Sequence, residues 1–110
     1  MVCNQWNIAI VPFPFVDAPK QKKRPVLIIS KNEFLEQNAH CIAAMITTGA
    51  NTKWVGDTLI EDLEKAGLKT PSYIRLKLFS LDMKLEPRVI GKLSQNDKDH
   101  FKKNFSKSVF

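Results

Sequence analysis

The feature that constrains the fold most is a succession of short apolar runs, rich in β-branched and aromatic residues and separated by polar, Pro- or Gly-containing segments. Such runs indicate strands, which we expect at residues 8–15, 24–30, 40–46, 57–60, 73–78 and within 85–92. Pro12 and Pro14 restrict the second half of the first run to a sheet edge or a bulge. Residues 61–66 are typical of one or two helical turns that end at Gly67. The pattern predicts a mainly β, α+β fold built on a small antiparallel β-barrel.

A different pattern begins near the carboxyl end. Phe101, Phe105 and Val109 recur at intervals of four residues, which places them in one apolar stripe of a helix. Ser94, with Asp97 three positions later, is close to a capping box and marks the start of that helix. We therefore expect a C-terminal helix appended to the barrel, with its Phe stripe packed on the sheet.

The length of 110 residues is that of one domain, so a single domain over residues 1–110 is expected. The longest apolar stretch, 8–16, is far shorter than the roughly 18 residues that a membrane helix needs. The amino terminus lacks the basic flank and cleavage site of a secretory signal. Cys3 and Cys41 form neither a disulfide framework nor a CxxC motif. These features predict a cytoplasmic protein with no membrane partner, in a reducing compartment.

The charge balance is basic, because 17 Lys and Arg residues against 11 Asp and Glu residues give a net charge of +6. A small basic domain attracts the phosphate backbone of a nucleic acid or an acidic protein partner. The same excess also serves solubility alone. The distribution of the charges has to decide between these interpretations.

Arg24 and Thr47 form the first candidate site. If their two strands pair antiparallel, one register sets Lys31 opposite His40 at one end and Arg24 opposite Thr47 at the other. An arginine fork beside the hydroxyls of Thr47 and Thr48 would make a phosphate clamp. The alternative is that Arg-Pro and Thr-Thr-Gly only mark the ends of ordinary strands.

The strand at 73–78 alternates strictly between apolar and polar residues. Its core-facing residues are expected to be Ile74, Leu76 and Leu78. The opposite face then carries Tyr73, Arg75 and Lys77 together. An aromatic ring beside two cations is a pattern that holds single-stranded nucleic acid, and an ordinary solvated strand face is the alternative.

A third basic cluster precedes the first candidate site. It comprises Lys20, Lys22 and Lys23, directly before Arg24. The cluster is suited to a nucleic-acid backbone, and a solvated loop with no binding role is the alternative.

No metal site or pair of acid–base histidines is expected. His40 begins an apolar strand and His100 lies in the C-terminal helix, so both are interpreted as structural or surface residues. An acidic cluster without nearby His or Cys is interpreted as a solvated helix start; its members are Asp57, Glu61, Asp62 and Glu64. Trp6 and Trp54 are interpreted as packing residues, with a groove-lining role as the second interpretation for Trp54.

Several motifs together resemble one known family, the PemK/MazF toxins of bacterial toxin–antitoxin pairs. The matching segments are QWNIAIVPFPFVD, KKRPVLIIS, AAMITTG, WVGDTLIEDLEKAGLKTPSYIRLKLFSLDMKL and IGKLSQND. The resemblance implies a strongly bent SH3-like β-barrel that forms a homodimer. It also implies a ribonuclease that cuts single-stranded mRNA without a metal or other cofactor, and a cognate antitoxin that covers the RNA groove with an extended, largely acidic segment.

The same resemblance implies roles for individual residues. The key arginine of the family falls on Arg24, its hydroxyl residue on Thr47 and a neighbouring small hydroxyl residue on Thr48. Further RNA contacts would come from the loop near residues 20–23 and from the strand that holds Arg75.

Two positions depart from the family pattern. Lys77 stands where some members carry an aspartate proposed as an acid–base residue, so that role does not transfer. Trp6-Asn7 replaces the Gly-Asp opening of many members and resembles a Trp-Asp variant. A charge-dependent role at Asn7 therefore does not transfer either.

The expected reaction is in-line attack of an RNA 2′-hydroxyl on the adjacent phosphate, giving 2′,3′-cyclic phosphate and 5′-hydroxyl ends. Arg24 would stabilise the pentacoordinate charge, while Thr47 and Thr48 would orient phosphate oxygens. The residue that removes the 2′-proton is left open. Lys77 is one candidate, since the like charge of Arg75 disfavours its protonated form, and simple solvation of Lys77 is the other interpretation.

Two rival functions are kept beside the nuclease. A CcdB-like toxin of the same fold family poisons DNA gyrase and depends on carboxy-terminal aromatic and apolar residues, and this chain ends with Val109 and Phe110. A non-catalytic RNA-binding barrel would bind RNA in a salt-dependent manner without cleaving it.

Overall fold

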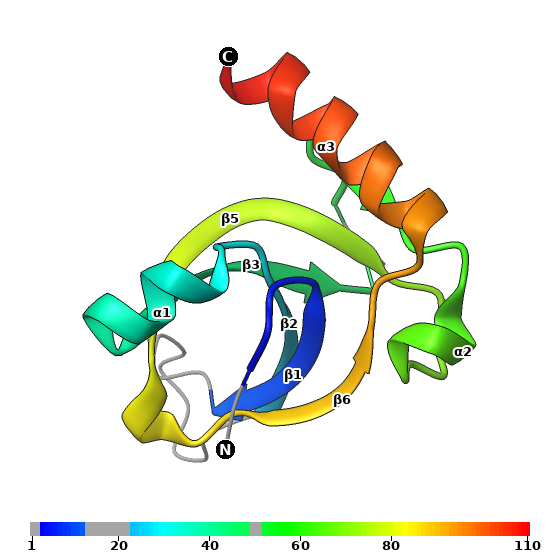
Figure 1. Cartoon of the computed structure of the whole chain (residues 1–110). Helices are drawn as coiled ribbons and strands as arrows, with labels where there is room; N and C mark the ends of the chain where they lie inside the picture. Colours follow the sequence, from blue (N-terminus) through cyan, green and yellow to red (C-terminus); the bar gives the residue numbers. More distant parts are fainter. Residues whose placement is uncertain (1–2, 13–22, 49–51) are drawn as a thin grey trace.

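A computed structural model describes residues 3–12, 23–48 and 52–110. Six strands form one sheet in the order β4-β5-β3-β2-β1-β6, with antiparallel neighbours. Their bounds are β1 Asn7–Pro12, β2 Lys23–Ile28, β3 His40–Thr47, β4 Thr58–Leu59, β5 Tyr73–Asp82 and β6 Arg88–Lys92. The sheet curls strongly around an interior (Figure 1). This confirms the expected mainly β, antiparallel class, with a barrel that is open between its outermost strands in the described part of the chain.

In the described part of the chain, three helices and one 3-10 turn accompany the sheet. They are α1 Asn32–Asn38, α2 Leu63–Ala66, the 3-10 turn Met83–Leu85 and α3 Gln95–Val109. α2 is the predicted short helix, and Gly67 ends it in the left-handed region at φ 75°. α1 occupies the connector between β2 and β3. Among the described residues, no helix is both long enough and apolar enough to cross a bilayer.

β2 is buried on both faces of the sheet, as its continuous apolar run predicts. Leu27 packs on one side with Ile8, Ala44 and Phe101 in the core beneath α3. Residues that alternate with these along the strands point to the other side of the sheet, where they form a second core. They include Val11, Val26, Ile28, Cys41, Ala43 and Leu81. Central strands held from both sides give a rigid frame for side chains at their ends.

β5 departs from the predicted alternation. Ala44 and Met45 are consecutive in β3, yet their partners are Leu78 and Arg75, so two residues of β5 bulge out of the ladder. The bulge turns Leu78 outward to 39% exposure and leaves Arg75 only 8% exposed. The expectation that Leu78 faces the core is therefore wrong, and so is the expectation that Arg75 shares an open face with its polar neighbours.

α3 begins as predicted, since the Ser94 side chain accepts a hydrogen bond from the Asp97 amide at 3.1 Å. Phe101 is buried and makes an edge contact with Trp6, whose ring centroid lies 6.0 Å away. Beyond Phe105 the helix extends past the sheet (Figure 1), and Val109 is half exposed. The apolar stripe therefore packs on the sheet through its first half only.

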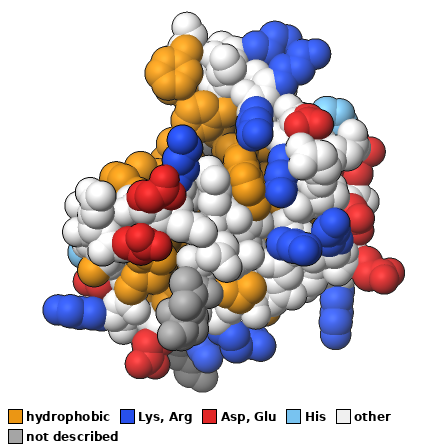
Figure 2. Space-filling view, viewed as in Figure 1, with side chains coloured by type: hydrophobic (Ala, Val, Ile, Leu, Met, Phe, Trp, Pro, Cys, Tyr) orange, Lys and Arg blue, Asp and Glu red, His pale blue; other side chains and the backbone are white. Residues whose placement is uncertain are grey.

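The outer part of the stripe remains visible on the surface. Hydrophobic side chains run from the carboxyl end of α3 toward the middle of this face, with Lys and Arg side chains beside them (Figure 2). Lys98 and Lys102 of α3 both lie over the Trp6 ring, at 6.0 and 5.5 Å from its centroid. The packing role expected of Trp6 is thus confirmed.

Candidate nucleic-acid site

Arg24, Thr47 and Tyr73 lie in one row across three neighbouring strands. Val26 is paired with Met45 in the β2–β3 ladder, and continuing this register by two residues sets Arg24 opposite Thr47, as expected from the strand ends. Thr47 is in turn paired with Tyr73 of β5. Residues directly opposite each other in a ladder point to the same face. The fold therefore brings these three side chains to one face of the sheet.

The Arg24 side chain has an unused donor. Its Nε is buried and has no hydrogen-bond partner among the described residues. A buried donor without an acceptor costs about 1–3 kcal/mol, while the Arg24 residue as a whole is only partly buried. Lys23, at the start of β2, and Thr48, after the end of β3, are exposed at the end of the sheet next to the row. The cluster can therefore present a guanidinium and hydroxyls to an anion.

Arg75 has a different environment. Its Nε donates to Asp57 Oδ1 at 3.2 Å and its Nη2 donates to Asp57 Oδ2 at 3.0 Å. The same Nη2 donates to the Thr52 carbonyl at 2.7 Å, and the guanidinium carbon lies 5.0 Å from the centre of the Trp54 ring. The guanidinium is thus engaged by three groups of the loop before β4, so it is no open cation for a backbone phosphate.

The remaining predicted binding residues divide into described and undescribed ones. Lys77 is exposed and sits in the β5 bulge, outside the row of Arg24, Thr47 and Tyr73. Lys20 and Lys22 lie outside the described residues. Lys23 is the described member of this cluster, and it is exposed beside Arg24 at the start of β2.

Asp57 is a site residue that sequence reasoning assigned wrongly. It was expected in a solvated acidic cluster, yet its side chain is 4% exposed in the ion pair with Arg75. The two residues lie in different elements, and the sequence carries no local pattern that joins them. Trp54 stacks on the same arginine, and the residue is 44% exposed.

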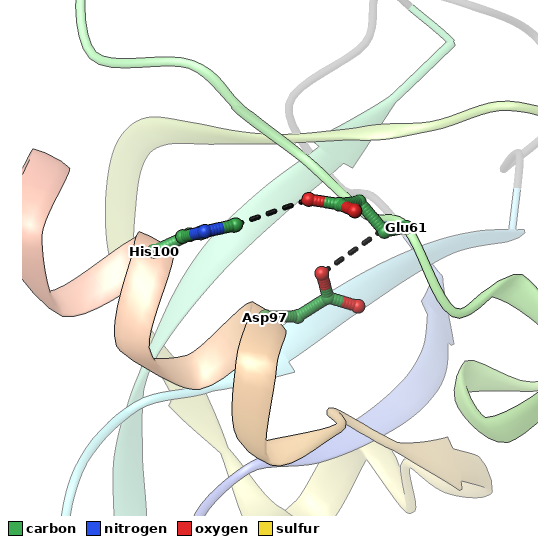
Figure 3. Close-up of side chains that lie close together, drawn as sticks. All are labelled: Glu61, Asp97 and His100. Carbon is green, nitrogen blue, oxygen red and sulfur yellow. Dashed lines mark hydrogen bonds and ion pairs between the residues drawn. The ribbon is translucent and has the colours of Figure 1, made fainter.

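Glu61, Asp62 and Glu64 are exposed and Asp62 caps α2, as expected for a solvated helix start, but a histidine does lie near Glu61. His100 Nδ1 is 3.3 Å from Glu61 Oε1, and Asp97 lies beside them (Figure 3). Donor atoms of these three residues fall within 4.8 Å of one another, a set that zinc uses. The two oxygens of the buried Asp97 already accept the amides of Glu61 and Asp62, at 3.0 Å each. These hydrogen bonds explain the cluster as a clamp between α3 and the segment before α2.

The two cysteines are buried and free. Burial raises the pKa of the Cys3 thiol. Burial, with a smaller contribution from Cys3, raises the pKa of Cys41 to about 12. A thiolate is the reactive form of cysteine, so neither residue is suited to nucleophilic chemistry at neutral pH.

A hollow in the surface lies elsewhere. It measures about 750 Å³ and is mainly apolar; it is lined by Leu35, Glu36, Ala39, Met83, Glu86, Pro87, Arg88 and Val89. These residues gather near the His40 end of β3, whereas Thr47 ends the strand. Seven residues of strand separate the two ends, roughly 23 Å. The hollow therefore contains none of the candidate site residues.

Solved structures share this fold. MazF (Form-I) from Deinococcus radiodurans is 12% identical, with a TM-score of 0.75 over 99% of this chain and 97% of that chain. The Mycobacterium tuberculosis toxin MazF-mt6 is 20% identical, with a TM-score of 0.71 over 93% and 94%. An endoribonuclease in complex with its cognate antitoxin, from a Mycobacterial species, is 12% identical, with a TM-score of 0.73 over 97% and 92%.

Sequence comparison agrees with the structural one at the level of the family. No curated protein sequence matches the chain. The family model of the PemK-like, MazF-like toxin of type II toxin–antitoxin systems matches residues 4–109. Because that match spans nearly the whole chain and the curled sheet with its C-terminal helix is the fold of MazF structures, the chain belongs to the PemK-like, MazF-like toxin family.

Proposed function

We propose that this toxin-family protein is an endoribonuclease that cleaves single-stranded mRNA without a metal ion. The observation that carries the proposal is the row of Arg24, Thr47 and Tyr73 on one face of the sheet, with a buried Arg24 donor left unpaired among the described residues. A guanidinium beside hydroxyls suits a phosphodiester. The basic charge of the chain favours the same class of substrate.

The proposed chemistry uses the 2′-hydroxyl of the RNA as nucleophile. Its oxygen bonds to the adjacent phosphorus while the bond to the 5′-oxygen breaks, leaving a 2′,3′-cyclic phosphate and a 5′-hydroxyl. The proton lost by the 2′-hydroxyl is balanced by the one gained at the leaving oxygen. Arg24 binds the phosphoryl oxygens as negative charge builds on them, and Thr47 and Thr48 orient those oxygens. Fixed donors of this kind act through electrostatic stabilisation and positioning.

The proposed partners follow from the family and the charge. Solved relatives include MazE–MazF complexes from Deinococcus radiodurans. For this chain we expect a homodimer and a cognate antitoxin whose acidic, extended segment covers the basic site. A small acidic protein encoded directly beside this chain, and co-purification of the two, would support this partnership.

The direct test is incubation of the purified protein with single-stranded RNA in excess chelator, followed by mapping of the RNA ends. Arg24→Ala should lower the cleavage rate about 100-fold or more, because one donor to the developing charge is lost. Thr47→Ala should also lower the cleavage rate. Arg88→Ala removes an exposed arginine from β6 and serves as the matched control, with an unchanged rate. Intact RNA at every site, or cleavage that survives the double Arg24→Ala, Thr47→Ala change, would refute the nuclease.

Gyrase poisoning is the second candidate, and one observation favours it. Phe110 is 94% exposed at the end of α3 and Val109 is half exposed, so both are open to a partner. Removing Val109 and Phe110 separates the two functions. A nuclease keeps its RNA cleavage after this truncation, whereas a gyrase poison loses its effect on supercoiling.

A further inference from the structure

Arg75 and Asp57 form a buried ion pair that fixes the loop before β4. The fork of Arg75 meets both carboxylate oxygens, and the two side chains are 9% and 4% exposed. The third contact, from Nη2 to the Thr52 carbonyl, ties the other end of the loop. A bidentate, desolvated pair of this kind is geometrically demanding. The backbone from Thr52 to Asp57 is therefore held from the side of β5.

Short-range contacts fix the turn that carries Trp54. The Trp54 amide donates to Asp57 Oδ2 at 3.1 Å, and the Asp57 amide donates to the Trp54 carbonyl at 3.2 Å. Gly56 has φ 97°, and a Cβ there would come within 2.8 Å of Leu76 and 2.9 Å of Ser108. Only glycine fits this conformation and this space without strain. Trp54 thus stands on a pre-organised turn.

The Trp54 ring is exposed although it is a large aromatic group. The Arg75 guanidinium lies over the ring at 5.0 Å from its centre, and Trp54 as a residue is 44% exposed. Arg75 covers one face of the ring, so the opposite face is the one on which another ring could stack. Asp57 and Thr52 already accept hydrogen bonds from Arg75. Trp54 is therefore not needed to satisfy the hydrogen-bond donors of this arginine. An open π-face on a rigid support is suited to stacking another ring.

The arginine that contacts the Trp54 ring lies near the row of Arg24, Thr47 and Tyr73. Met45 is paired with Arg75, and Thr47 is paired with Tyr73. Arg75 therefore occupies the next row on the same face, about 7 Å along the strands. If an RNA strand is bound through one phosphate at the row of Arg24, Thr47 and Tyr73, the base next to that phosphate would lie toward Trp54.

We propose that Trp54 is a stacking platform for one unpaired base of single-stranded RNA, and that Arg75 and Asp57 are the residues that position it. The inference rests on the proposed function for the identity of the ligand. Trp54 touches the base, whereas Arg75 acts through Trp54. Because every base has a π-face, the platform accepts any of them and contributes affinity next to the scissile phosphate.

Trp54 fluorescence gives a direct readout of stacking. In a Trp6→Phe background, Trp54 is the remaining tryptophan of the chain. A short single-stranded 2′-O-methyl oligonucleotide, which cannot use its 2′-oxygen for cleavage, should quench this fluorescence on binding. An abasic ribose-phosphate chain of the same length should bind through its phosphates with far weaker quenching.

Affinity gives the second readout. Trp54→Ala should weaken binding of the same oligonucleotide about 5- to 150-fold, the range for one base stacked on an aromatic side chain. Val55→Ala changes the neighbouring, 95% exposed residue and is the matched control, with unchanged affinity. Unchanged affinity in Trp54→Ala, or equal quenching by the abasic chain, would overturn the platform. Loss of self-association or of antitoxin binding in Trp54→Ala with RNA affinity intact would also overturn it, in favour of a protein contact.

Kinetics separate the platform from the nuclease itself. Trp54→Ala should raise KM for RNA while kcat stays close to that of the wild type, because stacking holds substrate and transition state alike. Arg75→Lys keeps the charge but loses the fork, so it should raise KM in the same way, with little further effect in Trp54→Ala. Quenching and base-dependent binding without any cleavage would refute the nuclease and leave the platform standing. Cleavage by the Trp54→Ala variant with a wild-type KM would refute the platform and leave the nuclease standing.

Discussion

Arg24 and Arg75 lie in adjacent rows of the same sheet face, yet their surroundings are opposite. Arg24 has a buried donor without a partner among the described residues. Arg75 is held by a carboxylate, a carbonyl and an aromatic ring. From the sequence, both residues are interpreted as cations that bind RNA. The difference shows that the position of an arginine in a strand does not tell whether its charge is available, because the partner comes from elsewhere in the chain.

The two arginines should therefore fail in different ways when they are changed. Arg75 is predicted to contribute mainly to stability and to the placement of Trp54. Arg24 is predicted to contribute mainly to chemistry. Separate measurements of unfolding, cleavage and salt dependence test each half of this contrast.

The largest expected effect is on stability. Asp57→Ala removes the carboxylate from a pair whose side chains are less than a tenth exposed. An arginine left without its buried partner destabilises a fold by about 3–5 kcal/mol. We expect a loss of that size in the free energy of unfolding, measured by denaturant titration.

A matched double variant shows whether the stranded charge is the cause. Arg75→Met combined with Asp57→Leu removes both charges and should recover part of the loss, because apolar groups replace the pair without an uncompensated ion. If Asp57→Ala is as stable as the wild type, the ion pair does not hold the loop, and the contrast with Arg24 disappears.

The next effect is on cleavage without a cost in stability. Arg24→Met keeps the length of the side chain but removes the guanidinium and its unpaired Nε. The free energy of unfolding should be equal to or slightly above that of the wild type, since an unsatisfied buried donor is lost. The cleavage rate should fall about 100-fold or more. A strongly destabilised Arg24→Met protein would show that Arg24 is structural in the same sense as Arg75.

The sequence predicted the parts of the fold that depend on neighbouring residues or on the alignment of the ends of two strands. The register of β2 on β3 followed from the two strand ends and placed Arg24 opposite Thr47. Ser94 and Gly67 marked a helix start and a helix end correctly, because caps depend on neighbouring backbone groups. The candidate residues Arg24 and Thr47 could thus be placed opposite each other from the sequence alone.

The parts that could not be predicted depend on distant partners. Over residues 73–78, the sequence of β5 alternates between apolar and polar residues without interruption. It therefore gives no sign of the bulge, which changes which residues face β3. Arg75 meets Asp57 from another element, and His100 meets Glu61 in the same way. Ion pairs between remote elements leave no periodicity in the sequence. The interpretation of Arg75 as an open cation was wrong for this reason.

The smallest expected effect is on the salt dependence of RNA binding, and it distinguishes the two arginines most directly. Each phosphate contact to a single strand makes the slope of log Kobs against log salt more negative by about 0.7. Arg24→Met should make that slope less steep by about this amount for an uncleavable oligonucleotide. Arg75→Lys should weaken binding through Trp54 and leave the slope unchanged, since Arg75 is occupied by Asp57. Lys69→Ala, an exposed lysine beyond α2, is the control for a general loss of charge. Equal slope changes for the two arginines would mean that Arg75 leaves its ion pair to bind phosphate, and the distinction between a chemical and a positioning arginine would be wrong.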